Sequence, residues 1–360
     1  MRVRLLFGPA GSGKTRRCLD EIRAALAGAP EGPPLLFLAP KQATFQIERQ
    51  LLADPALAGF TRLHILSVDR LAVRVLRELG RPAPELLAEE GRLMVLRALL
   101  HTHHGRLQIF RASARLAGFA VELSRLLRLF QHHRVTPGQL AELARAPALS
   151  APLRGKLADL ALLLAAYQQW LEAHGLQDAE VLPAAAAAAL RSARGGFPPA
   201  LRFAGLWLDG FAEMTPQEIE LLAALLPAGE QATLAFCLEA PPPDNTHWLS
   251  PWTPVSDTVR RLRARLAELP GCAVELETLP RTVDRGRFAT APALQHLEAH
   301  WAAPRPFMGD PAPAVRVFEC GDPEQEVVLA AREILQFVRD TGGVIGRRRF
   351  CCAAWRATPS

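Results

Sequence analysis

Cysteine pairs at metal-binding spacing are missing from this sequence. Six cysteines occur in 360 residues, and no two of them form a CxxC or CxxxC pair. Disulfide-stabilised small domains and zinc knuckles depend on such spacings or on a much higher cysteine content, so the sequence argues against both classes. We therefore expect a reducing compartment, in which Cys18 is a small buried residue of a predicted helix.

Long apolar runs are also missing. No segment offers about eighteen uncharged apolar residues, and the longest candidate, Leu157–Tyr167, is interrupted by Asp159. The apolar stretch at the start, Met1–Phe7, is too short for the core of a signal peptide and contains two arginines. These absences predict a soluble cytoplasmic protein without a membrane partner.

What the chain does contain is an ordinary globular composition. Hydrophobic residues make up 49% and charged residues 22%, which excludes intrinsic disorder as a description of the whole. Lys and Arg exceed Asp and Glu by six, and the isoelectric point is near 9.4. This mild basic excess is compatible with a polyanionic partner. The length is sufficient for two or three packed units.

Short apolar runs predict an α/β fold with a parallel sheet. The runs are continuous rather than alternating, which is typical of strands covered on both faces. The predicted strands are Val3–Phe7, Leu35–Ala39, Arg62–Ser67, Phe203–Leu208 and Ala232–Leu238, with Cys272–Leu276 as an edge strand. Helical spacing of apolar residues predicts helices over Thr15–Leu26, Val68–Leu79, Pro216–Leu226 and Leu262–Leu269.

An all-helical insertion interrupts this pattern. From Ala83 to about Ala193 the sequence is rich in Leu and Ala and shows no convincing strand. Pro241–Pro254 and Ala291–Pro313 are interpreted as irregular, whereas a strand at Val315–Glu319 and a helix over Glu324–Asp340 begin a further unit. The predicted organisation is one α/β domain in two halves (1–82 and 196–290), the helical insertion (83–195), an incomplete second domain (291–345) and a tail (346–360).

A glycine-rich loop follows the first predicted strand. It reads Gly8, Pro9, Ala10, Gly11, Ser12, Gly13, Lys14 and Thr15, which fits the phosphate-binding pattern G-x-x-x-x-G-K-[ST] without a mismatch. Glycines allow successive backbone N–H groups to point at a phosphate, and the following helix N-terminus favours the same negative charge. Lysine then reaches the terminal phosphates and the threonine hydroxyl ligates Mg²⁺. The motif predicts binding of ATP with Mg²⁺.

A second acidic position completes the predicted nucleotide site. The apolar run Leu206–Leu208 ends in Asp209, which we interpret as the carboxylate that supports Mg²⁺; the alternative is an Asp that caps the following turn. The next residue is Gly210, where a fast ATPase would carry a Glu to activate water. Glu213 is the nearest substitute, although a surface or helix-capping role fits it equally well. We therefore expect nucleotide binding, with weak hydrolysis by this chain alone.

The residues now described resemble a known family, the B subunit of the AddAB-type ATP-dependent helicase–nuclease, which processes double-strand DNA breaks. The match runs over nearly the whole chain, to about Gly343, and the Asp-Gly-Phe sequence after the strand Phe203–Leu208 is more specific than a generic acidic motif. It is carried by the stretches Gly8–Thr15, Leu38–Phe45, Leu66–Arg74, Leu208–Glu218, Leu294–Glu298 and Glu324–Ile334.

The resemblance implies a RecA-like, superfamily-1 helicase core and an ATP-binding accessory subunit for DNA repair by recombination. It implies DNA as a partner, together with a motor and nuclease A subunit in a heterodimer. Helicases of this type contact single-stranded DNA after the second strand, at Lys41, Gln42 and Phe45; Phe45 is alternatively a core residue of the next helix. The family's nuclease domain and iron–sulfur cluster lie far beyond residue 360, and no cysteine here is assignable as a cluster ligand.

Two other function classes stay open at this point. One is a free-standing P-loop NTPase or kinase acting on a small substrate, and the other is a non-catalytic scaffold with a vestigial P-loop. The tail from Arg347 to Ser360 is unlike the apolar strand expected there. One hypothesis is a frameshift near Ile345, because a one-base shift within suitable codons for Arg349–Ala353 restores an apolar run; the alternative is a genuine basic, disordered tail.

Overall fold

The computed structural model describes residues 1–341 except 56, 58, 83, 194, 195, 246, 248, 283, 285 and 313, with the side chains of 117 and 341 also left aside. The predicted tail and the frameshift position at Ile345 lie outside these residues. The chain divides into two units, Met1–Thr290 and Ala291–Ser360. Every helix within the described part is too short or too polar to cross a membrane.

A six-stranded parallel sheet forms the centre of the first unit. Its strand order is β3-β2-β6-β7-β1-β8, and every neighbouring pair is parallel. All six predicted strands are present, and the last of them lies at an edge of the sheet as expected. Their bounds are β1 Arg2–Gly8, β2 Leu35–Leu38, β3 Leu63–Leu66, β6 Phe203–Leu208, β7 Gly229–Cys237 and β8 Ala273–Thr278.

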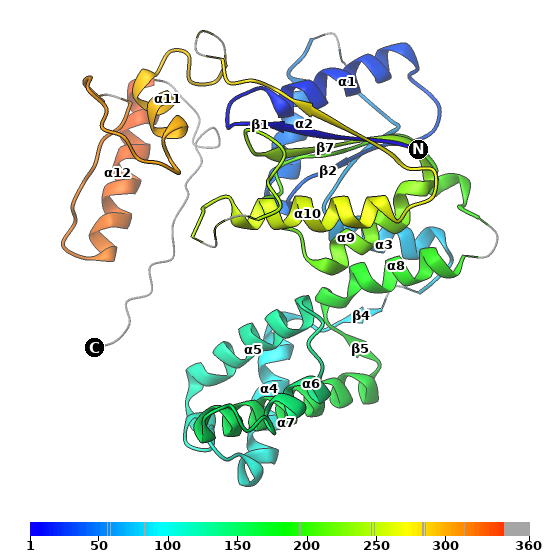
Figure 1. The fold of residues 1–360 in the computed structure, drawn as a ribbon, viewed down its shortest axis with the longest axis vertical. Helices are drawn as coiled ribbons and strands as arrows, with labels where there is room; N and C mark the ends of the chain where they lie inside the picture. Colours follow the sequence, from blue (N-terminus) through cyan, green and yellow to red (C-terminus); the bar gives the residue numbers. More distant parts are fainter. Residues whose placement is uncertain are drawn as a thin grey trace. The chain divides into compact units, whose positions relative to one another are not determined.

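Helices cover both faces of the sheet (Figure 1). On one face lie α1 (Lys14–Gly28) and α2 (Thr44–Leu52), whose apolar residues share a core with Leu35 and Phe37 of β2. The opposite face is covered by α3 (Val68–Glu78), α8 (Leu182–Ser192), α9 (Pro216–Leu225) and α10 (Thr253–Ala267). All four residues of β2 are buried, which explains why its sequence is apolar without alternation.

Helix α10 begins earlier than the sequence predicts. The expected start is Leu262, after a loop over Pro241–Pro254, but the helix begins at Thr253. Pro254 lies in the first turn, where the missing N–H of proline has no intrahelical partner to lose. Proline therefore starts this helix instead of ending the loop. Short 3₁₀ turns connect other elements, at Lys41–Ala43, His104–Arg106, Ser113–Arg115, Ala179–Val181, Pro199–Leu201 and Leu226–Ala228.

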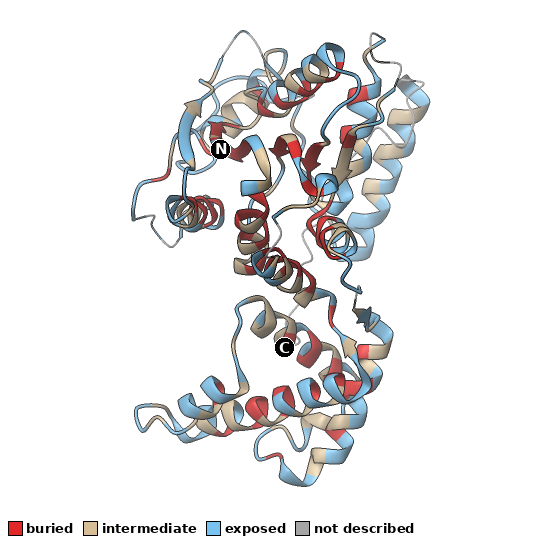
Figure 2. Cartoon of the chain, turned by 90° about the vertical axis from the view of Figure 1, so that its right-hand side faces the viewer, coloured by how far each residue is buried: buried red, intermediate tan, exposed pale blue. Residues whose placement is uncertain are grey.

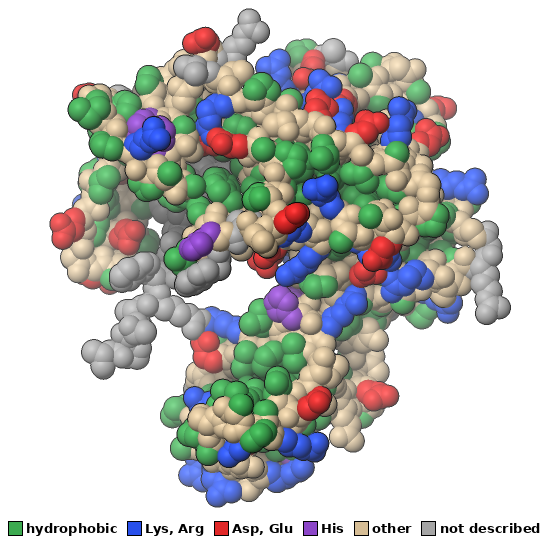
Figure 3. Space-filling view, in the orientation of Figure 1, with side chains coloured by type: hydrophobic (Ala, Val, Ile, Leu, Met, Phe, Trp, Pro, Cys, Tyr) green, Lys and Arg blue, Asp and Glu red, His purple; other side chains and the backbone are tan. Residues whose placement is uncertain are grey.

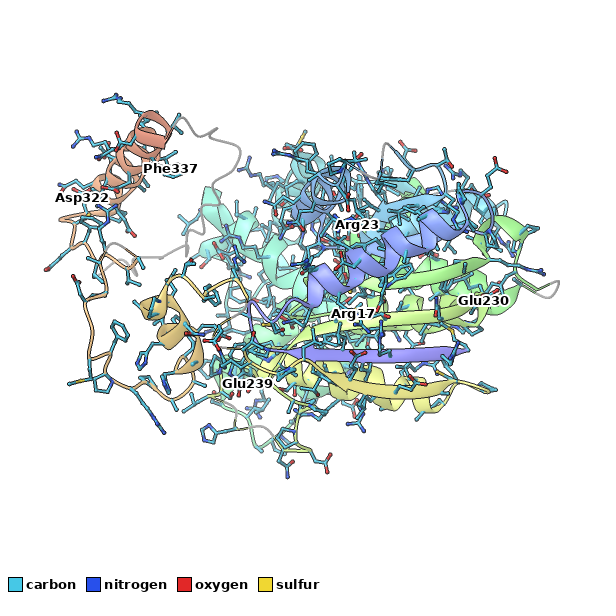
Figure 4. All side chains as sticks on the ribbon, turned by 90° about the horizontal axis from the view of Figure 1, so that it is seen from above. Arg17, Arg23, Glu230, Glu239, Asp322 and Phe337 are labelled. Carbon is cyan, nitrogen blue, oxygen red and sulfur yellow. The ribbon has the colours of Figure 1, made fainter. Side chains whose placement is uncertain are left out.

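Helix α1 is fixed to the sheet by a polar cluster. The carboxylate of Glu21 accepts hydrogen bonds from Arg4 of β1 (2.6 Å) and from the indole N–H of Trp207 in β6 (2.9 Å). Arg17, which lies on the same helix and is labelled in Figure 4, donates to Glu21 as well (2.8 Å). Burial raises the pKa of Glu21, but the bonds from Arg4, Trp207 and Arg17 outweigh it and lower the pKa overall. The ionised carboxylate thus holds α1, and the loop before it, in place.

The helical region has a hydrophobic core of its own. Helices α4 (Glu89–His103), α5 (Ala117–His132), α6 (Pro137–Leu143) and α7 (Ala151–His174) bury one another's apolar faces. In Figure 2 the lower part of the first unit shows buried residues on the inner sides of these helices. One expectation for this region is wrong: it contains two short parallel strands, β4 (Glu85–Leu86) and β5 (Leu176–Gln177), where the chain enters and leaves the helices. Two residues are too few to leave a periodic signal.

Helix α8 belongs to the sheet and not to the helices before it. Its buried residues Leu182, Ala186, Ala187 and Leu190 lie in the same core as α3 and α9. Ala186 and Ala187, from the alanine tract of this helix, are fully buried. Small side chains permit close approach of α8 to its neighbours, since fully buried alanines leave room for the larger residues opposite.

The second unit differs from its prediction in two places. The stretch 291–313, expected to be irregular, contains α11 (Pro292–Ala299). Val315–Glu319, expected to be a strand, forms no strand, and Val317 is 91% exposed. A strand needs a hydrogen-bonding neighbour, which the described residues do not offer to this segment. The following helix, α12 (Pro323–Thr341), agrees with the predicted helix over Glu324–Asp340.

Candidate nucleotide-binding site

The glycine-rich loop joins the carboxyl end of β1 to the N-terminus of α1. Two of its glycines have positive φ, Gly11 at 79° and Gly13 at 95°. Gly13 is the N-cap residue of α1, so the loop leads directly into the first turn of the helix. A side chain at either position would be strained, because positive φ brings Cβ close to backbone atoms. The strand–loop–helix context that the motif requires is therefore present.

Lys14 is folded back into the loop. Its side chain is buried, and its Nζ donates hydrogen bonds to the carbonyl oxygens of Gly8 (2.6 Å) and Pro9 (2.7 Å). Burial lowers the pKa of Lys14, while nearby Cys237 and Asp209 act in the opposite direction. The ammonium group is thus held over the loop by neutral acceptors and beside a carboxylate.

Asp209 lies at the same end of the sheet as the loop, where the parallel strands have their carboxyl ends, directly after β6. The Thr15 hydroxyl donates to its Oδ2 at 2.5 Å, although the two residues are 194 positions apart in the sequence. Burial raises the pKa of Asp209, whereas the bond from Thr15 and the charge of Lys14 lower it. The predicted proximity of Asp209 to the loop is therefore seen. A hydroxyl and a carboxylate oxygen side by side are ligands of the kind that Mg²⁺ prefers.

Ser12 supplies an independent sign that the loop suits a polar ligand. Its Oγ is buried and has no hydrogen-bond partner among the described residues. The close approach of Gly8 leaves no space on that side, because a Cβ on Gly8 would lie 2.4 Å from Ser12 Oγ. Buried polar atoms without partners are costly and rare, so such an atom in a phosphate-binding sequence fits an anionic oxygen as its partner.

Gly210 has a conformational reason to be glycine. Its φ is 88°, and a Cβ at this position would lie 3.2 Å from Cδ of Pro40. A glutamate here would have the same backbone strain as any other non-glycine residue. The glycine that replaces the expected catalytic Glu is thus built into the turn after β6.

We expect Gly210→Ala to destabilise the chain by about 1–3 kcal/mol, because alanine must adopt a left-handed conformation against Pro40. Urea unfolding followed by circular dichroism measures this. Gly28→Ala is the matched control: Gly28 ends α1 without positive φ, and no atom lies within 4 Å of its added Cβ. The control should be neutral or slightly stabilising. Equal effects of the two substitutions would contradict the strain argument.

The segment after Gly210 is organised by a helix cap. Thr215 and Glu218 form a capping box at the start of α9, with Thr215 N donating to Glu218 (2.7 Å) and Glu218 N donating to Thr215 Oγ1 (3.2 Å). Capping by this pair, and not by Glu213, begins the helix. Glu213 is exposed, and the hydrogen bond to the Asp209 carboxylate comes from Thr15. The structure thus leaves Glu213 on the surface.

Two of the three predicted DNA-contact residues line a cavity beside the nucleotide site. Lys41 and Gln42, which follow β2, share this cavity of about 360 Å³ with Glu213. Phe45 does not line it; its side chain is 66% exposed, and the Arg49 guanidinium lies 5.8 Å from the ring centroid. The alternative prediction, that Phe45 is a core residue of the helix, is therefore wrong.

Sequence reasoning missed one neighbour of the loop. Arg287 and Phe288 lie against Gly11, because a Cβ on Gly11 would come within 3.1 Å of both side chains. A Cβ on Gly286 would lie 3.0 Å from the Gly11 carbonyl oxygen. These residues are more than 270 positions from the motif and follow no recognisable pattern, so only the folded chain reveals the contact.

The sequence matches the family described as "ADDB, N-terminal" over residues 5–298. Relatives from Desulforudis audaxviator and Moorella thermoacetica, each named as the B subunit of an ATP-dependent helicase/deoxyribonuclease, are both 38% identical to this chain, over 351 and 356 residues. The relative of that name from Heliobacterium modesticaldum is 37% identical over 350 residues.

These alignments cover 94–95% of this chain but only 28–29% of each relative, so the chain spans less than a third of their length. The family match alone covers most of the chain, and it agrees with the resemblance that the loop and the Asp209 segment predicted. The chain therefore belongs to the ADDB N-terminal family.

Proposed function

We propose that this chain is the ATP-binding, DNA-interacting accessory part of an ATP-dependent helicase–exonuclease complex that repairs double-strand breaks by recombination. The observation that carries the proposal is the meeting of Lys14, Thr15 and Asp209 at one edge of the sheet, with 2.5 Å between the Thr15 hydroxyl and the Asp209 carboxylate. In open parallel sheets, ligands bind outside the carboxyl ends of the strands. We also propose that the α/β unit is RecA-like.

Gly8–Thr15 would hold the phosphates of ATP, and Thr15 and Asp209 would hold Mg²⁺. The ion, when bound, neutralises phosphate charge. The chain's own contribution is to orient the phosphates: the loop amides and the N-terminus of α1 face them, and Lys14 exchanges its two carbonyl acceptors for phosphate oxygens. The Ser12 hydroxyl, which has no hydrogen-bond partner in the described part of the chain, gains an acceptor at the same time.

Hydrolysis by this chain is proposed to be weak, because Gly210 stands where a water-activating Glu is expected and no described carboxylate is held beside Asp209 in its place. Gly210 cannot act as a base, and Glu213 is exposed. A helicase complex then needs its motor elsewhere, which supports an A-type partner subunit and a cytoplasmic heterodimer. The name of the relatives, a helicase/deoxyribonuclease subunit, favours this over a free-standing kinase or a vestigial scaffold.

DNA contact is proposed at Lys41, Gln42 and Phe45. Lys41 and Gln42 line the cavity of about 360 Å³ at the carboxyl ends of the strands. The exposed ring of Phe45 offers a surface for stacking on a base, and Arg49 beside it adds positive charge.

Substitution of Asp209 tests the nucleotide proposal. We expect Mg²⁺ to increase the affinity of the native chain for ATP. In Asp209→Asn this increase should be about 10- to 100-fold smaller, because the amide lacks the negative charge that holds the ion. Isothermal titration with and without Mg²⁺ measures it. Asp244→Asn, at an exposed site after β7, is the matched control and should retain the Mg²⁺ effect.

The pH dependence provides a second readout of the same variant. Because burial raises the pKa of Asp209, the ATP-free folded chain holds this proton at pH values where the unfolded chain has lost it. The free energy of unfolding therefore falls as pH rises from the ordinary carboxyl pKa through the raised one, and Asp209→Asn removes this contribution. Identical Mg²⁺ and pH responses in Asp209→Asn and the native chain would refute the assignment.

A further inference from the structure

Positive charge is concentrated in the helical part of the first unit. Between Gly91 and Leu171 the sequence holds eleven Lys and Arg but only three Asp and Glu. The rest of the chain holds 31 basic residues (Lys and Arg) and 33 acidic residues (Asp and Glu). The net charge of the whole chain is +6, so the positive excess of the chain comes entirely from this part. In Figure 3, Lys and Arg side chains gather at the lower end of the region formed by α4 to α7.

Five of these basic residues lie on two segments that internal contacts hold together. The buried carboxylate of Asp159 in α7 accepts hydrogen bonds from the backbone N–H groups of residues 108–110 at 2.9–3.2 Å. Gly155 of the same helix lies against Ile109, and a Cβ there would be 2.7 Å from Ile109 Cγ1. The turns before and after these residues therefore lie beside the first turns of α7. We call the resulting cluster the basic tip: Arg106, Arg111, Arg115, Arg154 and Lys156.

The charges of the basic tip are uncompensated. Within the described residues none of the five forms an ion pair, and Arg154 is half-buried while the others are exposed. Arg111 donates to the Gly105 carbonyl oxygen (2.7 Å) and Arg115 to the His104 imidazole (3.3 Å), which orient the side chains without neutralising them. The acidic residue closest in the sequence to Arg154 and Lys156 is Asp159, whose carboxylate already accepts hydrogen bonds from backbone N–H groups.

The start of α7 adds to this field. The helix is 24 residues long, its first turn contains no acidic residue, and its N-cap Ser150 makes no side-chain capping bond. The N-terminus of a helix carries partial positive charge, where cations are unfavourable and anions favourable. Arg154 and Lys156 in the first two turns are therefore in a costly position unless an anion lies near them.

We propose that the basic tip is a sequence-independent binding surface for the phosphodiester backbone of duplex DNA. The choice of DNA among polyanions rests on the proposed function; the anionic character of the ligand rests on the charges alone. Arginines fixed by neutral acceptors and unpaired lysine present a positive surface to successive phosphates, and counterion release drives such binding. Contact of this kind is separate from Lys14 and from the Lys41 and Gln42 cavity.

Fluorescence anisotropy of a labelled blunt DNA duplex, titrated with the full chain in nucleotide-free buffer at several salt concentrations, tests the proposal. Arg154→Gln/Lys156→Gln should lower affinity at least tenfold at about 50 mM salt. It should also reduce the slope of log affinity against log salt by about 2, since each lost phosphate contact removes about 0.9. This variant and its control are checked for an unchanged circular dichroism spectrum.

Arg261→Gln/Arg263→Gln is the matched control. Both residues are exposed on α10, at the same spacing, and neither has an ion pair among the described residues. The control should retain the native slope. An equal loss of affinity in both variants, which would be an effect of net charge, or an unchanged slope in the tip variant would overturn the proposal. Because ATP is absent from this experiment, a negative result does not bear on the proposed nucleotide site. A failure to bind ATP would likewise not bear on the basic tip.

Discussion

Lys14→Met is expected to weaken the binding of Mg²⁺–ATP about 10- to 100-fold. The lysine ammonium would donate charge-assisted hydrogen bonds to phosphate oxygens, which are worth about 1.5–3 kcal/mol each, and about 1.4 kcal/mol corresponds to tenfold in affinity. Methionine retains the length of the buried side chain, so the loss reports the charge and not a cavity. Isothermal titration measures the change.

Two comparisons make this result specific. Arg16→Met removes a positive charge two residues later, from a side chain that is 85% exposed and pairs with Asp20. The affinity of this control should stay within about twofold of the native value, since exposed charges are screened. Lys14→Ala should match Lys14→Met in affinity. Native-like binding by both Lys14 variants would favour a scaffold that retains the loop for folding alone.

Arg92→Met is expected to destabilise the helical region by about 3–5 kcal/mol. Arg92 is 1% exposed and pairs with Asp178, also 1% exposed, at 2.9 Å. Tyr167 donates to the same carboxylate at 2.6 Å, and the Arg92 guanidinium lies 5.1 Å from the centroid of its ring. Removal of one partner from a buried ion pair leaves the other charge unpaired in a poorly solvated site, which costs this much.

Urea unfolding measures this loss of stability, and two further variants are compared with Arg92→Met. Arg97→Met, on the exposed side of α4, should change stability by less than about 0.5 kcal/mol. Arg92→Met/Asp178→Asn should recover part of the loss, because the unpaired charge is gone. Tyr167 is the sole tyrosine of the chain, so a single fluorotyrosine NMR signal reports whether its hydroxyl bond survives. If Arg92→Met lowers the free energy of unfolding no more than Arg97→Met does, the Arg92–Asp178 ion pair does not stabilise the fold.

The Arg92 cluster also connects the helical region to α9, the helix that follows Asp209. Gln131 accepts from Arg92 (3.0 Å) and donates to Asp178 (2.6 Å), and its backbone oxygen accepts from Gln217 of α9 (2.8 Å). Gln217 is buried and belongs to the capped helix that follows Asp209. The Thr-Pro-Gln-Glu stretch that contributes to the family resemblance is thus explained: it caps α9 and bonds the helical region to it.

Local signals were sufficient for the strands, the loop and most helices. Apolar runs of five to seven residues predicted the six strands of the sheet. Burial on both faces explains the continuous runs of the central strands, whereas the edge strand β8 is mostly exposed. The loop was readable because its chemistry depends on contiguous residues. Prediction failed where the local sequence is compatible with two structures. Pro254 lies in the first turn of a helix, and Val315–Glu319 has strand composition but no neighbouring strand among the described residues.

The sequence by itself determined the parallel α/β sheet, the position of the glycine-rich loop and the choice of Asp209, because each depends on residue types that are close in the chain. Only the tertiary structure decided that Thr15 bonds Asp209, that Phe288 covers Gly11, and that Arg92 pairs with Asp178. Such contacts join residues up to 277 positions apart, and no local periodicity encodes which of many polar side chains will meet when the apolar faces are buried.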